Sequence, residues 1–266
     1  GYEWNDVSSL TERRDDLQSR IENFNYDNLH RLTFTTGADP MTIAYDALGN
    51  ITSKSGVGTY AYHATRKHQA TAAGSNTYAY DANGNMNSRN GSSISWYSYD
   101  LPNTIAASGS NSSQFFYAPD RSPWKQVASY AGTSEQTIYI GGLIEKVTLG
   151  GVTSWKHYIA GGNGPAVLYI RRSSGTTETN YLLKDHLGST DVVLNSSGAV
   201  MSRLFEDAWG RRRNGATWTG NPASGEWTTI TNTTRHGFTF HEHLDNLGLI
   251  HMNGRVYDPA LARFVS

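Results

Sequence analysis

The segment YAYDANGN, residues 78–85, decides how this chain is expected to fold. Its first part alternates aromatic and small side chains, which places the aromatic rings on one face of a β-strand. In the part that follows, Asp hydrogen-bonds backbone amides two or three residues further on. Gly and Asn accept positive φ, so the chain reverses tightly. Residues 86–89 then return as the partner strand, and the segment predicts a β-hairpin.

The same pattern recurs along the first half of the chain. Its anchor tyrosines are Tyr26, Tyr45, Tyr62, Tyr80, Tyr99 and Tyr117. Successive anchors are separated by 19, 17, 18, 19 and 18 residues, which indicates hairpin units of about 18 residues. Because one hairpin is marginally stable alone, we expect neighbouring units to pair edge to edge in a long, coiling antiparallel sheet.

Three other segments need an interpretation. Residues 10–24 carry apolar side chains at helical spacing, but residues 11–16 also alternate as in a strand. We favour a strand there, because the repeat continues directly from it. Residues 214–232, rich in Gly, Thr, Asn and Trp, are predicted to form an exposed insertion. The three consecutive arginines at 211–213 are predicted to lie in a solvated turn, since so isolated a run does not indicate a nucleic-acid site.

Composition excludes several classes of protein. The absence of cysteine excludes disulfide frameworks, zinc fingers and thiol catalysis. A formal net charge of −1 provides no overall field towards nucleic acid or acidic lipid. The sequence contains no long apolar run, so we expect no membrane span, and no signal-peptide pattern. It begins without Met and stops at Ser266 without a closing signal, so we expect a fragment of a longer protein.

The C-terminal third carries a second distinctive pattern. It contains DHLGST at 185–190, GFT at 237–239 and HEHLDNLGLIHMNGRVYDPALARFVS at 241–266. These stretches resemble the Rhs-associated core, and the upstream hairpin units resemble YD repeats. The chain is thus similar to the Rhs/YD-repeat shells of bacterial polymorphic toxins and to the C component of insecticidal toxin complexes. The resemblance implies an all-β fold, with a repeat wall at 1–175 and the core, truncated at its C-terminal end, at 176–266.

The resemblance also implies a function. In that family a hollow shell encloses a toxic C-terminal domain, and the core is an aspartic autoprotease that releases it. An Arg in the pattern Asn-x-Arg-x-Tyr-Asp-Pro takes part, which assigns a catalytic role in the intact protein to Arg255. The acid that works with it is expected beyond Ser266, so we expect this fragment to be no enzyme. Ala262 stands where the family has Gly, which leaves self-cleavage of this copy open.

Arg255 and Asp258 also have structural interpretations. Arg255 is alternatively a cation that bridges strand carbonyls or pairs with Asp258. Asp258 precedes Pro259, and proline holds its predecessor in an extended conformation, which is typical of a turn. We therefore interpret Asp258 as a turn former rather than as the catalytic acid.

Four histidines gather within sixteen residues, namely His236, His241, His243 and His251. A His-x-His pair on a strand has usable metal spacing, but the zincin pattern His-Glu-x-x-His is missing. We interpret these residues as hydrogen-bonded core histidines and expect neither a metal nor a cofactor. The Asp, His and Ser within 185–189 do not form a hydrolase triad, because Gly-x-Ser-x-Gly is missing.

A second function from another class stays open at this stage. The repeats alternatively form an adhesive surface array, without a payload, that binds glycans or partner proteins. Such an array exposes its aromatic face, whereas a shell hides the aromatics and keeps a polar lumen. For the shell, the expected partners are its own C-terminal toxin domain and a second shell or delivery component, with no nucleic acid. The expected location is secreted or on the bacterial cell surface.

Overall fold

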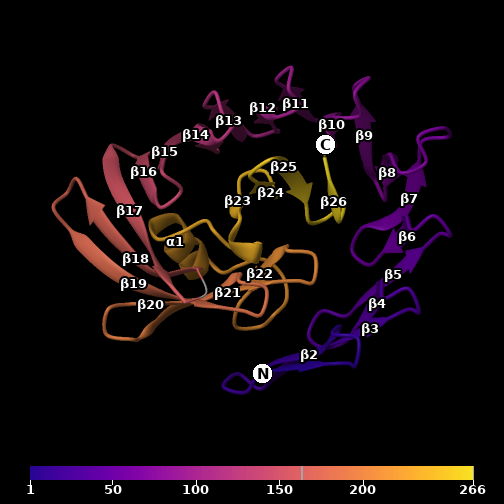
Figure 1. Cartoon of the computed structure of the whole chain (residues 1–266), viewed down its shortest axis with the longest axis horizontal. Coiled ribbons are helices and arrows are strands. Elements are labelled where there is room, and N and C mark those ends of the chain that lie inside the picture. Colours follow the sequence, from indigo (N-terminus) through magenta and orange to yellow (C-terminus); the bar gives the residue numbers. More distant parts are fainter. Residues whose placement is uncertain (163, 266) are drawn as a thin grey trace.

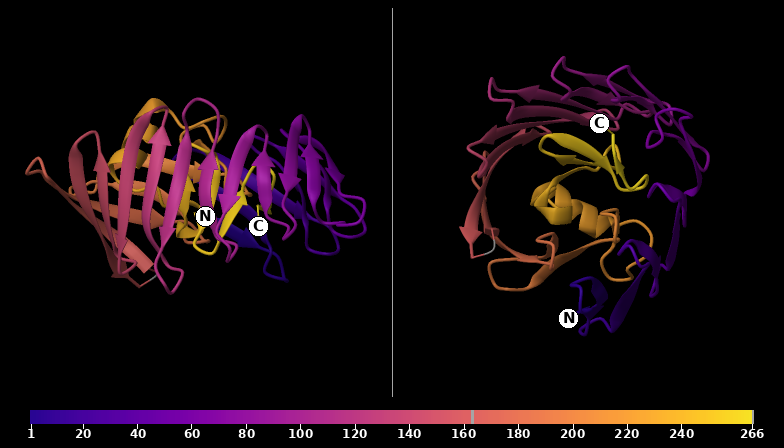
Figure 2. Two further views of the ribbon diagram at one scale, coloured as in Figure 1. Left: turned by 90° about the horizontal axis from the view of Figure 1, so that it is seen from above. Right: turned by 45° about the vertical axis from the view of Figure 1, so that its right-hand side comes forward.

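The computed structural model describes residues 1–162 and 164–265, so Ser266, the last residue of the predicted core, lies outside the described residues. One sheet of 22 strands forms a curved wall. Each of its strands, β1 to β22, pairs antiparallel with the next one in the chain. Within the curve lies a second sheet of four strands (Figures 1 and 2). The predicted coiling, all-β antiparallel sheet is confirmed.

The first part of the wall consists of short strands. They are β1 (Tyr2–Trp4), β2 (Leu10–Asp15), β3 (Arg20–Tyr26), β4 (Leu32–Thr35), β5 (Met41–Tyr45), β6 (Ile51–Lys54), β7 (Gly58–Tyr62), β8 (Ala70–Ala73), β9 (Asn76–Tyr80), β10 (Met86–Arg89), β11 (Ser92–Trp96), β12 (Pro102–Ala106) and β13 (Ser112–Tyr117). Residues 10–24 thus contribute to strands β2 and β3, as predicted.

The second part of the wall contains mostly longer strands. They are β14 (Pro123–Tyr130), β15 (Thr133–Ile140), β16 (Ile144–Leu149), β17 (Val152–Gly161), β18 (Gly164–Arg172), β19 (Thr177–Lys184), β20 (Thr190–Leu194), β21 (Val200–Glu206) and β22 (Arg212–Asn214). The predicted boundary at 175/176 falls between β18 and β19, which are neighbours in the same sheet. That boundary stays a prediction.

The remaining elements lie inside the wall, and we call them the plug, residues 224–265 (Figure 2). They are α1 (Ser224–Asn232), the 3₁₀ turn η1 (Phe238–Phe240), β23 (Glu242–Leu244), β24 (Leu249–Met252), β25 (Arg255–Asp258) and β26 (Arg263–Phe264). No helix among the described residues is long and apolar enough to span a membrane.

The repeat turn has a recurrent hydrogen-bond pattern, seen at Asp27 and Asp46. Asp46 represents it. Its Oδ1 accepts the backbone N–H of Leu48 at 2.9 Å and of Asn50 at 2.8 Å. The aspartate therefore reaches residues two and four positions on, rather than the predicted two or three. Gly49 completes the turn at φ +85°, a left-handed conformation that glycine adopts without a steric penalty.

The anchor tyrosines join successive repeats. Four of the six, Tyr26, Tyr45, Tyr62 and Tyr80, donate their hydroxyl to the carbonyl of the first residue of the preceding even-numbered strand. Tyr45 donates to Leu32 at 2.8 Å and Tyr80 to Ala70 at 2.8 Å. Burial raises the pKa of both phenols to about 12, so they remain protonated donors. In the fifth unit the predicted anchor Tyr99 is wrong. The indole of Trp96 makes this contact instead, donating from Nε1 to the carbonyl of Met86 at 2.9 Å.

Two predictions near the end of the wall are also wrong. Within 214–232, predicted to be exposed, residues 224–232 form α1, and the side chains of Trp218 and Ile230 are buried. Ile230 packs with the inward apolar residues of β17 to β21, and Trp227 and Phe240 pack against the same cluster. Of the arginines at 211–213, predicted to be solvated, Arg212 and Arg213 are buried in β22 because carboxylates surround them.

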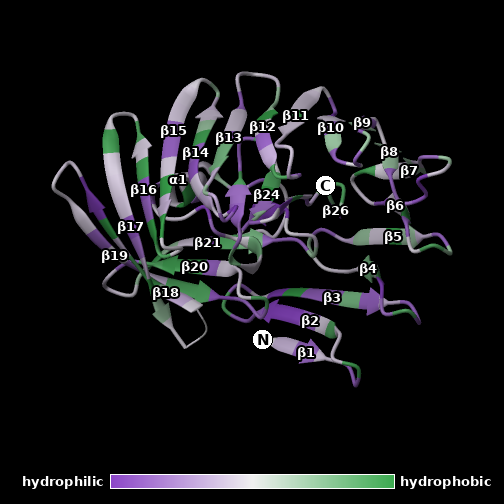
Figure 3. Cartoon of the chain, turned by 45° about the horizontal axis from the view of Figure 1, so that its top comes forward, coloured by the Kyte–Doolittle hydropathy of each residue, from purple (hydrophilic) through white to green (hydrophobic). Residues whose placement is uncertain are grey.

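Polar and apolar residues alternate along the wall strands, and this decides which side chains face the plug (Figure 3). The main apolar core lies between strands β5 to β13 and the plug. Its wall members include Ile43, Met86 and Phe115, and its plug members include Leu249 and Val256. The plug thus provides the apolar surface against which the repeat wall buries its inner face.

Candidate functional site

The C-terminal strands of the plug lie against the inner face of the wall (Figures 1 and 2). The backbone N–H of Met86, in β10, donates to the carbonyl of Val265 at 2.8 Å. Lys54 donates from Nζ to the carbonyls of Pro259 and Ala260 at 3.1 and 2.9 Å. Backbone and side-chain bonds together hold the last residues of the described chain inside the lumen.

Asp258 occupies a structural position at the end of β25. Its Oδ1 accepts the backbone N–H of Ala260 at 2.9 Å and of Leu261 at 3.0 Å, which forms the turn after Pro259. Its other oxygen accepts Nε of Arg89 at 2.6 Å. The interpretation of Asp258 as a turn former is confirmed, and its cation partner is Arg89 of the wall rather than Arg255.

Arg255 begins β25 and is exposed. Its guanidinium carbon lies 3.6 Å from the centre of the Phe264 ring, a cation–π contact within the plug. Among the described residues no carboxylate forms an ion pair with Arg255. Its guanidinium is therefore placed at the C-terminal strand and is free to bind an anionic group.

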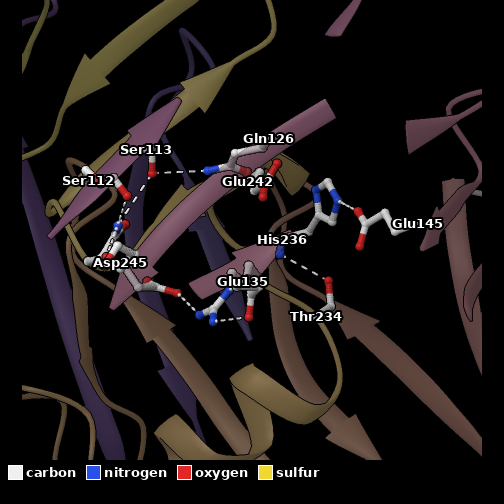
Figure 4. A network of polar contacts seen from close by, with 12 residues as sticks. Ser112, Ser113, Gln126, Glu135, Glu145, Thr234, His236, Glu242 and Asp245 are labelled. Carbon is white, nitrogen blue, oxygen red and sulfur yellow. Dashed lines mark hydrogen bonds and ion pairs between the residues drawn. The ribbon is translucent and has the colours of Figure 1, made fainter. Parts of the chain in front are cut away.

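At strands β15 and β16 the plug contacts the wall through buried charged side chains (Figure 4). Arg235, after α1, forms two hydrogen bonds with Glu135 of β15, both 2.9 Å long, and pairs with Asp245 at 3.2 Å. Arg212 of β22 pairs with the other oxygen of Asp245 at 2.8 Å. Carboxylates and arginines thus alternate in a chain that runs from Glu135 of the wall through Arg235 and Asp245 of the plug to Arg212 of the wall, so each buried charge has a partner of opposite sign.

His236 is the second charged anchor of the plug. Its Nε2 lies 2.7 Å from Oε1 of Glu145 in β16, and its Nδ1 lies 2.8 Å from the carbonyl of Phe240. Both ring nitrogens face acceptors, so only the imidazolium form satisfies both contacts. Burial alone lowers the pKa of His236, but the charge of Glu145 and the hydrogen bond to it outweigh burial and raise that pKa above its usual value.

Glu242 belongs to the same network. Its carboxylate accepts the hydroxyl of Tyr139 at 2.5 Å. Burial, followed by the negative charge of Glu145, raises the pKa of Glu242 to about 7. These groups line a hollow of about 660 Å³ between the wall and the plug, with the ring of Trp124 among its lining residues.

His243 and His251 are buried, which confirms the prediction of core histidines for these two residues. His251 stacks on Phe115 of the wall with ring centres 4.9 Å apart. No group of three potential metal ligands occurs among the described residues. Residues 185–189, which were not expected to form a hydrolase triad, form another repeat-type turn. Asp185 accepts the backbone N–H groups of Leu187 and Ser189, both at 2.8 Å.

The buried state of His251 predicts a pH effect. Burial, and to a lesser extent His241, lowers its pKa from 6.5 to about 4. Below pH 6.5 the unfolded chain binds a proton at His251, whereas the folded protein binds it only near pH 4. The neutral, buried His251 therefore contributes to the free energy of unfolding at neutral pH, and this contribution is lost as the pH falls. Between pH 7 and pH 5 it amounts to about 2 kcal/mol.

The raised pKa values of Glu206 and Glu242 increase the free energy of unfolding as the pH falls, opposite to the effect of His251. The loss due to His251 is therefore measured as a difference between the wild type and a variant. Urea denaturation at pH 7 and pH 5 is expected to give a smaller acid-induced loss for His251→Gln than for the wild type. The exposed His30→Gln serves as the control. Equal losses in the wild type and His251→Gln would contradict the assignment of a neutral, buried His251.

Arg235, Glu135 and Glu145 were not singled out from the sequence. Glu145 sits in step with the inward Val147 on β16, so strand alternation alone places it on the covered face. What the alternation does not reveal is which cation lies opposite, because His236 and Arg235 follow about 90 to 100 residues later.

The fold has counterparts among solved structures. The crystal structure of TcdB2-TccC3-Cdc42 matches with a TM-score of 0.64 and 14% identity, over 100% of this chain and 17% of that one. TcdB2-TccC3 without hypervariable C-terminal region and TcdB2-TccC3 itself match with TM-scores of 0.63 and identities of 13% and 14%, with the same coverage. No family model and no curated protein matches the sequence.

These toxin-complex structures share the open, coiling shell fold of this chain, which is the fold that the resemblance implied. The chain spans about a sixth of the length of the chains it matches.

Proposed function

We propose that this chain is part of the wall and plug of an Rhs-repeat toxin shell, whose intact protein encloses its own C-terminal toxic domain. One observation carries this proposal: the repeat wall surrounds the C-terminal strands, and Val265 is held on its inner face. A chain that continues from this place starts inside the lumen. A hollow of about 720 Å³ beside β26, lined by residues that include Tyr80, Trp209 and Phe264, offers space at this point.

In the intact protein Arg255 acts in aspartic-type self-cleavage that frees the enclosed domain. The free, exposed guanidinium on β25 supports this role, since a cation beside a carboxylate keeps that carboxylate ionised or stabilises developing negative charge. The acid itself is expected after residue 266. Residues 1–266 without that acid are expected to be catalytically inactive.

The packing of the repeat aromatics favours the shell over the adhesive array. Tyr60 and Tyr78 are buried towards the plug, and the hydroxyls of Tyr45 and Tyr80 are bonded to backbone carbonyls. Trp4 remains exposed, so glycan binding through exposed aromatic side chains stays a prediction. Secretion or display on the cell surface, and a second shell or delivery component as a partner, likewise belong to this proposal.

Intact-mass measurement of the natural full-length protein tests the cleavage step. The wild type is expected to yield two polypeptides, and Arg255→Ala one. Arg171→Ala is the matched control, because Arg171 is an exposed arginine stacked on Trp155 at 4.9 Å on the outside of the wall. Cleavage of Arg255→Ala at the wild-type rate would contradict the role of Arg255.

A further inference from the structure

The β2–β3 hairpin and the strands β21 and β22 meet at a junction where the described residues form no backbone ladder. There the hairpin of β2 and β3 lies beside β21 and β22 (Figure 1). Within the described residues, β2 and β3 pair with β1, with each other and with β4, and β22 pairs with β21 alone. Every other neighbouring pair of wall strands shares ladder hydrogen bonds, so this junction depends on side chains.

Buried charges cross the junction. Glu22 of β3 accepts Arg13 of β2 at 2.6 Å and, from the other end of the wall, Arg213 of β22 at 3.2 Å. The side chains of Glu22 and Arg213 are only 3% and 2% exposed, and that of Arg13 is 11% exposed. One carboxylate therefore lies between two arginines in a place from which water is largely excluded.

Further contacts align the two ends. Arg13 donates from Nη2 to the carbonyl of Glu206 at 2.8 Å and lies over the ring of Phe205 at 4.2 Å. Asp15 pairs with Arg203 at 3.3 Å. Arg20 donates to the carbonyl of Ala216 at 3.2 Å, which adds a contact from the turn end of the hairpin.

We propose that this junction is an electrostatic latch at which the ring of the wall opens and closes without unfolding. The ladders hold each strand pair through many backbone bonds, whereas the latch depends mainly on the charge of Glu22. Removing that charge leaves the buried guanidinium of Arg13 without its carboxylate. Arg213 then keeps only Asp39, at 3.3 Å, whose side chain is 39% exposed, so the two arginines repel each other with little compensation. The inference concerns how the ring closes, and it stands or falls independently of any enclosed domain.

Pulsed electron spin resonance on the full chain tests the latch. Because the sequence contains no cysteine, spin labels attach only where cysteines are introduced. The reporter pair is Leu17→Cys with Thr217→Cys, both exposed, on the two sides of the junction. The control pair is Leu29→Cys with Leu48→Cys, at two neighbouring turns of the wall, 70% and 59% exposed.

In the otherwise unaltered chain the reporter pair is expected to give one narrow, short distance. With Glu22→Gln it is expected to lose most of this short component, while the control pair keeps its distance distribution. The additional change Arg213→Met, which removes one of the two like charges, is expected to restore most of the short component.

An unchanged reporter distribution in Glu22→Gln would overturn the latch. So would a change in both pairs, because it would mean that the wall unfolds together with the junction. A lack of recovery with Arg213→Met would show that charge repulsion is not what opens the junction, and would also overturn it.

Discussion

Arg235→Met is expected to lower the free energy of unfolding by about 3–5 kcal/mol, because the substitution leaves the buried carboxylate of Glu135 without its cation and removes one of the two cations paired with Asp245. Glu135 loses both of its hydrogen bonds to the guanidinium, and Asp245 keeps only Arg212. The ring of Tyr130, which lies 4.2 Å from the guanidinium carbon, loses its cation–π contact as well. Urea denaturation monitored by circular dichroism measures the loss.

Two companion variants make this result specific. Arg235→Met combined with Glu135→Leu removes both members of the main pair, and we expect it to recover most of the lost stability, since apolar replacement of a buried pair is often neutral. Arg172→Met is the control, because its partner Glu178 has a side chain that is 40% exposed. A loss of about 1 kcal/mol or less is expected for the control. A similarly small loss for Arg235→Met would contradict the buried anchor.

Asp258→Ala is the second substitution with a large expected effect, about 3 kcal/mol or more. It removes the acceptor of two backbone N–H groups and leaves Arg89 of the wall without its ion-pair partner. The Asp258 side chain is 1% exposed, so water does not replace these contacts. The loss is again measured by urea denaturation.

Asp27→Ala is the matched control for Asp258→Ala. Asp27 accepts the backbone N–H groups of Leu29 and Arg31 and pairs with the Arg31 guanidinium, but its side chain is 25% exposed. The same set of contacts near solvent is expected to contribute clearly less than at Asp258, because water competes for them. Equal losses for the two variants would show that burial between plug and wall does not strengthen the Asp258 site.

Local chemistry made the wall predictable from the sequence. The Tyr-Asp and Gly-Asn pattern defines a strand end and a turn within ten residues, so Tyr45, Asp46 and Gly49 indicate their own structure. Trp96 was not recognised as an anchor because the tyrosines at 97 and 99 match the repeat spacing better. Only the structure reveals that an indole N–H reaches the same carbonyl position.

The buried ion pairs were not predictable in the same way. Arg213 and Glu22 are 191 residues apart, and Arg235 and Glu135 are 100 residues apart. The run at 211–213 has the composition of a solvated turn, and only the return of the chain to β3 buries Arg213. Residues 214–232 were predicted to be exposed for the same reason, since the apolar surface that covers Ile230 comes from five distant strands.

Protection from protease tests the central claim, the enclosure of a C-terminal domain, most directly. The natural full-length protein is treated with a nonspecific protease, and the surviving fragments are identified by mass. The account predicts that the segment after residue 266 survives within the shell but is digested quickly when expressed without the wall. Digestion at the same rate in both preparations would contradict enclosure and would favour an adhesive array without a payload.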